Sequence, residues 1–167
     1  LAVSSINPNK NFAAVLRALE LLGPDAPPCV IAGQRYAKVF GYSSLDETSI
    51  THVGHVSDAE LYALYSKAEC LLFPSFYEGF GLPPLEAMIS GCPVITSRTS
   101  SLPEVCGEAA IYVDPFERDD IRSAIQRVID NPELRARLAA AGRDRARHFT
   151  FENYLTALGD AYSRISG

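Results

Sequence analysis

Short apolar runs alternate with amphipathic stretches along most of the chain, and this alternation restricts the possible folds more than any other feature. Runs with the length of buried strands occur at residues 1–4, 29–32, 50–53, 70–73, 93–96 and 110–113. Between them, apolar residues recur at helical spacing, as at Val15, Leu19 and Leu22. Strands that alternate with helices form a parallel sheet with helices on both faces. We therefore expect an α/β fold, a three-layer sandwich whose parallel sheet has about six strands.

Start and stop signals indicate where the helices lie. Ser57 followed by Glu60 has the pattern of a capping box, and Gly23 and Asn131 mark helix ends. Helices are expected over 11–22, 58–68 and 82–90 and in three segments after 117, with a short helical turn over 103–105. Residues 34–49 are polar and aperiodic, which is typical of a loop or a short helix. We expect one domain, 1–167, with the sheet in 1–114 and a helical C-terminal tail in 115–167.

The composition excludes several classes of protein. Of the 167 residues, 47% are hydrophobic and 21% are charged, which is ordinary for a globular domain and excludes a disordered tail or a fibre. Fifteen Lys and Arg against twenty Asp and Glu give a net charge of −5, so we expect no nucleic-acid partner. No apolar run reaches the roughly 18 residues of a membrane span. The chain begins at Leu1, inside an expected strand, and we expect it to be part of a longer protein.

The cysteines and histidines suggest no metal or redox centre. The cysteines are Cys29, Cys70, Cys92 and Cys106. None forms a C-x-x-C pair, so we expect buried, reduced thiols, which are typical of a cytoplasmic protein. His52 and His55 alone are too few ligands for a metal site, and no Asp-x-Asp sequence occurs.

The loop that follows the expected strand 70–73 carries the strongest functional signal. Ligands of parallel sheets bind beyond the carboxyl ends of the strands, where this loop lies. Gly79 and Gly81 allow a close backbone approach, and the amides of Phe80, Gly81 and Leu82 open the following helix. A helix N-terminus of this kind favours an anion such as phosphate. The stretch lacks the third glycine of a dinucleotide fingerprint and does not follow the first strand, which argues against NAD.

Two glutamates flank this candidate phosphate site. Glu78 precedes the helix and Glu86 lies about one turn inside it. Carboxylates repel phosphate but accept hydrogen bonds from vicinal hydroxyls, so the pair suits a nucleoside diphosphate sugar. Each could also be an ordinary solvated residue. In the first loop, Lys10 could neutralise a diphosphate leaving group beside Ser5, or it could simply face solvent.

These motifs resemble the C-terminal, nucleotide-binding domain of the family 4 retaining glycosyltransferases of GT-B fold, which is Rossmann-like. The resemblance covers nearly the whole chain, and the stretch from Glu78 to Met88 is its most specific part. The other matching segments are Asn7-Pro-Asn-Lys-Asn11, Gly54-His-Val56, Pro74-Ser75, Gly91-Cys-Pro-Val94, Leu102-Pro-Glu104 and Phe149-Thr-Phe151.

The resemblance implies a role for individual residues. The catalytic residues would be Glu78, which would contact the donor sugar, and Lys10, which would bind and stabilise the diphosphate. Glu86 would hold the ribose hydroxyls, and backbone near Val56 would line the base pocket. The amides of Gly79, Phe80, Gly81 and Leu82 would contact the diphosphate. Ser5 stands where the family often has an arginine, and Phe151 where it often has tryptophan.

The resemblance also implies a reaction. The whole enzyme would transfer a hexosyl group, mannosyl or glucosyl, from a GDP- or UDP-hexose to a glycan or lipid-linked acceptor. Configuration would be retained, with no metal or other cofactor, in bacterial polysaccharide or glycolipid synthesis. An N-terminal domain, absent from these residues, would supply the acceptor site, and the enzyme would be cytoplasmic or at the inner face of the membrane. Two alternatives remain open: a non-catalytic sugar-nucleotide binding module, or another GT-B enzyme such as an epimerase.

Overall fold

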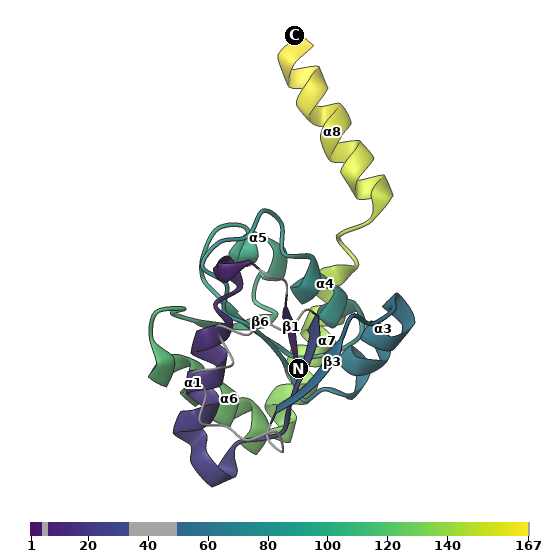
Figure 1. The fold of residues 1–167 in the computed structure, drawn as a ribbon. Coiled ribbons are helices and arrows are strands. Elements are labelled where there is room, and N and C mark those ends of the chain that lie inside the picture. The colour runs from purple at the N-terminus through teal and green to yellow at the C-terminus, as the bar shows by residue number, and fades with distance from the viewer. Residues whose placement is uncertain (5–6, 34–49, 167) are drawn as a thin grey trace.

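The computed structural model describes residues 1–4, 7–33 and 50–166, which form an α/β domain with an extended C-terminal helix (Figure 1). Its strands are β1 (Ala2–Ser4), β2 (Cys29–Gly33), β3 (Ile50–Gly54), β4 (Leu71–Phe73), β5 (Val94–Ser97) and β6 (Ala110–Val113). Each lies within about one residue of its expected position. The prediction for 34–49 and the candidate residue Ser5 lie outside the described residues.

The strands form two parallel sheets of three rather than one sheet of about six, so the predicted strand count of the sheet was too high. Their orders are β1-β2-β3 and β4-β5-β6. β1 and β4 are nevertheless neighbours, because the Leu72 N–H donates to the Leu1 carbonyl at 2.8 Å and the Leu1 amino group donates to the Cys70 carbonyl at 2.9 Å. The described hydrogen bonds across this junction involve only Leu1, so the ladder is not continued along β1. The order across both sheets is β3-β2-β1-β4-β5-β6, and it reverses between β1 and β4.

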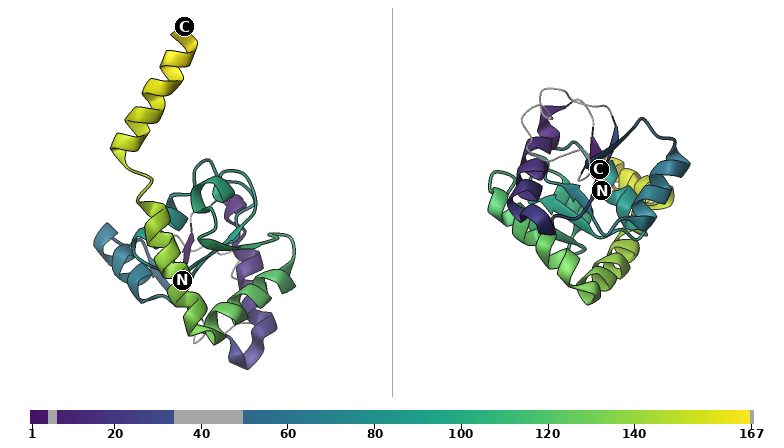
Figure 2. Two further views of the ribbon diagram at one scale, coloured as in Figure 1. Left: turned by 180° about the vertical axis from the view of Figure 1, so that it is seen from behind. Right: turned by 60° about the horizontal axis from the view of Figure 1, so that its bottom comes forward.

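Helices cover both faces, as expected for a three-layer sandwich (Figures 1 and 2). The helices of the domain body are α1 (Phe12–Leu22), α3 (Asp58–Lys67), α4 (Leu82–Ile89), α5 (Leu102–Cys106), α6 (Arg118–Asp130) and α7 (Pro132–Ala146). Short 3-10 turns occur at η1 (Pro8–Lys10) and η2 (Gly23–Asp25). α1 packs with α6, whereas α4 packs with α3 and α7. The predicted capping box is confirmed: Ser57 caps α3 and the Glu60 carboxylate accepts from the Ser57 N–H at 2.8 Å.

Strand β4 shows how the sequence divides the core into two layers. Leu72 belongs to the hydrophobic cluster under α1 and α6, whereas Leu71 and Phe73 belong to the cluster under α3, α4 and α5. Successive side chains of a strand point to opposite faces, so an unbroken apolar run is what a strand buried on both faces requires. The prediction of buried thiols is also confirmed, since all four cysteines are buried and unpaired.

Helix α8 (Phe151–Ser166) projects away from the rest of the domain (Figure 2). Its apolar side chains are exposed in this structure: Phe151, Tyr154, Leu155, Leu158, Tyr162 and Ile165. An amphipathic helix gains most of its stability by burying such a stripe, so α8 has the sequence of a helix that packs on another surface. None of the described helices is long and apolar enough to cross a membrane.

Candidate functional site

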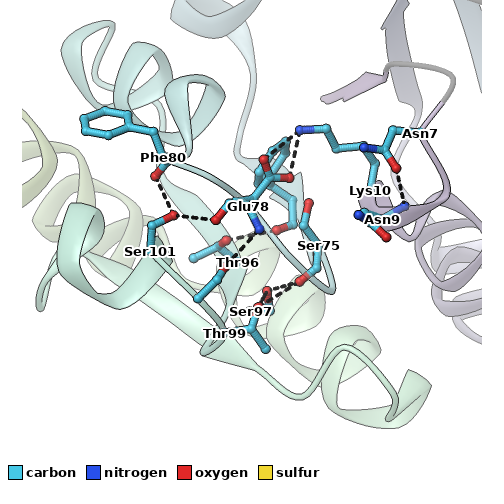
Figure 3. A network of polar contacts seen from close by, with 12 residues as sticks. Asn7, Asn9, Lys10, Ser75, Glu78, Phe80, Thr96, Ser97, Thr99 and Ser101 are labelled. Atoms are coloured by element: carbon cyan, nitrogen blue, oxygen red, sulfur yellow. Dashed lines mark hydrogen bonds and ion pairs between the residues drawn. The ribbon is translucent and has the colours of Figure 1, made fainter.

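Lys10 and Glu78 meet where the strand order reverses. Lys10 follows β1 and Glu78 follows β4, so both lie beyond the carboxyl ends of neighbouring strands. The Lys10 Nζ lies 2.8 Å from Glu78 Oε1 and 2.9 Å from Oε2, as Figure 3 shows. Only 17% and 10% of the two side chains are exposed, and the ammonium group lies 4.6 Å from the centre of the Phe73 ring. The structure therefore brings together the two residues that the sequence suggested as catalytic.

Asn11 fixes the loop that carries Lys10, and from the sequence it stood out only as the last residue of the matching segment Asn7-Pro-Asn-Lys-Asn11. Its buried side-chain amide donates to the carbonyls of Pro74, at 3.1 Å, and Pro115, at 2.7 Å. One side chain thus joins the loops that follow β1, β4 and β6. Its φ of +52° lies in the left-handed region, which asparagine tolerates better than most residues. A second hydrogen bond joins the loops after β1 and β4, because the Phe76 N–H donates to the Asn9 carbonyl at 2.8 Å.

The segment 79–82 presents backbone N–H groups at the start of α4. Within the described part of the chain, the N–H groups of Gly79, Phe80, Gly81 and Leu82 donate to no protein acceptor. Gly81 is the N-cap and has a φ of +101°, and a Cβ placed there would lie 2.9 Å from Leu102 Cδ2. The conformation favours glycine at this position, and a Cβ would also displace the end of the Leu102 side chain. Free N–H groups at a helix N-terminus form a site suited to an anion.

Glu86 lies on α4 and is exposed, with one carboxylate oxygen held by a buried tyrosine. The Tyr65 hydroxyl donates to Glu86 Oε2 at 3.1 Å. Burial, with the negative charge of Glu86, raises the pKa of Tyr65 well above its usual value, so the phenol stays protonated and keeps donating. Both residues line a groove of about 190 Å³ between α3 and α4. The rest of its lining is Asp58, Leu61, Tyr62, Ile89 and Ser90.

Two further predicted residues are Val56, in the β3–α3 turn, and Phe80, in the segment 79–82. Val56 is half-buried in the turn between β3 and α3, one residue before the cap Ser57. The ring of Phe80 is 45% exposed and packs edge-on against Phe149, with the ring centres 5.9 Å apart. Among the described residues, no cluster of three or more His, Cys, Asp or Glu side chains has the arrangement of a metal site.

The family model for glycosyl transferases group 1 matches residues 1–145. The chain belongs to this family. One relative of this glycosyltransferase domain is the O-antigen chain mannosyltransferase B of Escherichia coli, which is 36% identical over 173 residues, covering 99% of this chain and 45% of that protein. Another is the MMP alpha-(1->4)-mannosyltransferase of Mycolicibacterium hassiacum, which is 43% identical over 108 residues, covering 62% and 26% of the two chains.

A solved structure of the same fold supports the GT-B assignment. A mutant of TarM from S. aureus, in complex with fondaparinux, alpha-GlcNAc-glycerol and UDP, superimposes with a TM-score of 0.83 at 19% identity. The match covers 95% of this chain and 34% of TarM. The glycosyltransferase domain described here thus spans less than half the length of the relatives it matches.

Sequence reasoning missed the contribution of the loop that joins β5 to α5. In this glycosyltransferase domain the hydroxyls of Ser97 and Thr99 both donate to the Ser75 carbonyl, the second at 3.0 Å (Figure 3). The Thr96 hydroxyl donates to the Phe73 carbonyl at 2.9 Å. The sequence does show a run of hydroxyl residues at the carboxyl end of β5. The carbonyls that these hydroxyls bind lie more than 20 residues earlier in the chain, so the sequence alone does not identify them.

Proposed function

We propose that this chain is the nucleotide-sugar-binding domain, residues 1–167, of a glycosyltransferase that transfers a hexosyl group to an acceptor hydroxyl. The observation that carries the proposal is the pairing of Lys10 with Glu78, where the strand order reverses. This pair lies next to the N–H groups of 79–82, which donate to no acceptor among the described residues. A cation and unbonded N–H groups at a helix N-terminus together suit a diphosphate. Family membership and the named mannosyltransferase relatives support a mannosyl donor.

Each charged residue has a distinct task in this proposal. The donor diphosphate binds against Lys10 and the amides of 79–82, which stabilise the charge that grows on the leaving group. Glu78 then accepts hydrogen bonds from hydroxyls of the donor sugar. Glu86 accepts hydrogen bonds from the ribose hydroxyls, and the backbone at Val56 borders the base. We expect the transfer to retain anomeric configuration and to proceed without a metal ion.

A donor-binding domain alone does not make a complete transferase, because the acceptor also needs a binding site. The relatives are more than twice as long as their matched segments, which supports a second domain that binds a glycan or lipid-linked acceptor. The exposed apolar stripe of α8 supports a contact with that domain. The O-antigen enzyme among the relatives supports a role in polysaccharide synthesis, in the cytoplasm or at the inner face of the membrane.

Calorimetric titration of the 167-residue chain with GDP, UDP and ADP tests donor binding. We expect saturable binding of GDP or UDP, with a dissociation constant below a millimolar. Absence of saturable binding of all three nucleotides at millimolar concentration would remove the proposal. Assay of the full-length protein for transfer from GDP-mannose and UDP-glucose then separates a transferase from a module that only binds the donor.

A further inference from the structure

Two adjacent serines contact the backbone of Glu78 on both sides. The Ser100 Oγ accepts a hydrogen bond from the Glu78 N–H at 2.9 Å. The Ser101 Oγ lies 3.0 Å from the Glu78 carbonyl and 2.9 Å from the Phe80 carbonyl, so its single proton serves both acceptors (Figure 3). The Glu78 backbone is therefore held independently of the ion pair that its side chain makes with Lys10.

Ser100 adopts a backbone conformation that is unfavourable for its residue type. Its φ is +48°, in the left-handed region that residues other than glycine and asparagine rarely occupy. Such conformations persist where surrounding contacts compensate for them, and they gather at functional sites. The next residues continue the contact, since Ser101 bonds to Phe80 and Leu102 packs against Gly81. Residues 100–102 thus touch the Glu78 loop along its length.

We infer that Ser100 and Ser101 are positioning residues for the donor diphosphate and sugar, an inference that rests on the proposed function. Among the described residues, no acceptor bonds to the N–H groups of 79–82, so no hydrogen bond of these groups fixes their direction. They bind an anion well only if they already converge before it arrives, because ordering them on binding weakens affinity. The two serine hydroxyls supply this order from a neighbouring loop, without touching the donor.

Four variants separate positioning from a general effect on folding. Ser101→Ala removes the bridging hydroxyl, and Ser101→Thr retains one. Ser100→Gly removes the other hydroxyl while relieving the left-handed backbone, so a loss of binding could not come from added strain. Ser66→Ala is the matched control, because the exposed Ser66 hydroxyl also donates to a backbone carbonyl, at 2.9 Å, but on α3.

The affinity for a nucleoside diphosphate relative to its monophosphate is the decisive readout. With the better binder of GDP and UDP, we expect Ser101→Ala and Ser100→Gly each to weaken diphosphate binding about fivefold, which is the value of one hydrogen bond. Monophosphate binding should change less than twofold, and Ser101→Thr and Ser66→Ala should resemble wild type. Unchanged diphosphate affinity in both single variants would overturn the inference and leave the proposed function standing, whereas a wild type that binds no nucleotide would remove both.

Amide relaxation provides a readout that needs no ligand. ¹⁵N order parameters for Gly79, Phe80 and Gly81 should be those of rigid backbone in wild type and fall below about 0.6 in Ser101→Ala. Order parameters that stay at the wild-type value in Ser101→Ala would contradict the inference even if binding fell. The same spectra report whether each variant is folded, so a variant that fails to fold is recognised directly.

Discussion

The Lys10 ammonium group and the Glu78 carboxylate form a two-point ion pair across 68 residues of sequence, with contacts of 2.8 and 2.9 Å. The pair joins the loops after β1 and β4, the two strands at which the strand order reverses. The ion pair holds Lys10, the cation proposed to bind the diphosphate, in a fixed position relative to Glu78, the carboxylate proposed to bind the donor sugar. A donor that enters this site must share Lys10 with Glu78.

Lys10→Ala tests this pair. It leaves a largely buried carboxylate without its cation, so we expect a loss of about 1–3 kcal/mol in the free energy of unfolding, measured with urea. The double variant Lys10→Met, Glu78→Gln should recover most of that stability and still fail to bind a nucleoside diphosphate. Lys67→Ala, at an exposed position on α3, serves as the control. A Lys10→Ala protein with wild-type stability and affinity would disprove the pair's importance.

Two substitutions of Asn11 separate the contribution of its side-chain hydrogen bonds to stability from that of its left-handed backbone conformation. Asn11→Ala removes both hydrogen bonds and leaves a left-handed φ on alanine, whereas Asn11→Gly removes the bonds and tolerates the φ. We expect Asn11→Gly to lower the free energy of unfolding by about 1–3 kcal/mol, since two carbonyls lose their partner. Asn11→Ala should cost roughly 1 kcal/mol more. Equal urea midpoints for the two variants would show that the backbone conformation contributes nothing.

Glu86 is the second carboxylate whose role can be measured alone. Glu86→Ala removes an exposed side chain that would accept hydrogen bonds from ribose hydroxyls, so nucleotide affinity should fall tenfold or more. The free energy of unfolding should fall by only about 1 kcal/mol, because Glu86 is exposed and only the Tyr65 hydroxyl loses an acceptor. Glu152→Ala on α8 is a suitable control for loss of one surface charge. Unchanged calorimetric affinity would remove Glu86 from the site.

Tyr65→Phe probes how Glu86 is held. The change deletes the hydroxyl that donates to Glu86 Oε2 and keeps the ring in the core, so we expect a threefold to tenfold loss of nucleotide affinity. The loss should be smaller for a nucleotide whose ribose lacks a hydroxyl, because the two changes act on one contact. Tyr62→Phe changes an exposed tyrosine of the same groove and should bind normally. Equal losses with both nucleotides would mean that Tyr65 does not act through Glu86.

The buried thiols predict how stability depends on alkaline pH. Burial raises the pKa of Cys70 from about 9 to about 11 and the pKa of Cys92 to about 12. At a pH between the thiol pKa of the unfolded chain and the raised pKa of the folded chain, the unfolded chain has lost the thiol proton and the folded chain retains it. The free energy of unfolding is therefore highest below about pH 9 and falls as the pH rises above it. Urea unfolding at pH 7.5 and 10.5 should differ by about 1–2 kcal/mol from Cys70 alone. Cys70→Ala should reduce that difference, and an unchanged difference would contradict the assignment.

Local patterns predicted the elements well because their causes are local. The apolar run of β4 and the Ser57–Glu60 capping box act within a few residues, and both are present. The loops that carry Lys10 and Glu78 were also expected at the carboxyl ends of strands. Their direct pairing was not, because it depends on β1 and β4 being neighbours, a long-range relation that no local pattern encodes.

The missed features have the same physical origin. Asn11 bonds to carbonyls 63 and 104 residues away, and the loop 97–101 bonds to residues more than 20 positions earlier. The break between the two sheets depends on how far the ladder between β1 and β4 extends, which composition does not reveal. The positions of the strands could thus be predicted from residue type. The contacts that assemble the candidate site could be identified only from the three-dimensional structure.

The preference of the wild-type chain for a nucleoside diphosphate over its own monophosphate tests the central claim most directly. Calorimetry with GDP and GMP, and with UDP and UMP, measures that preference for two bases. If Lys10 and the amides of 79–82 bind the diphosphate, at least one diphosphate should bind tenfold or more tightly than its monophosphate. Equal affinities within each pair, or no binding of either diphosphate, would contradict the account.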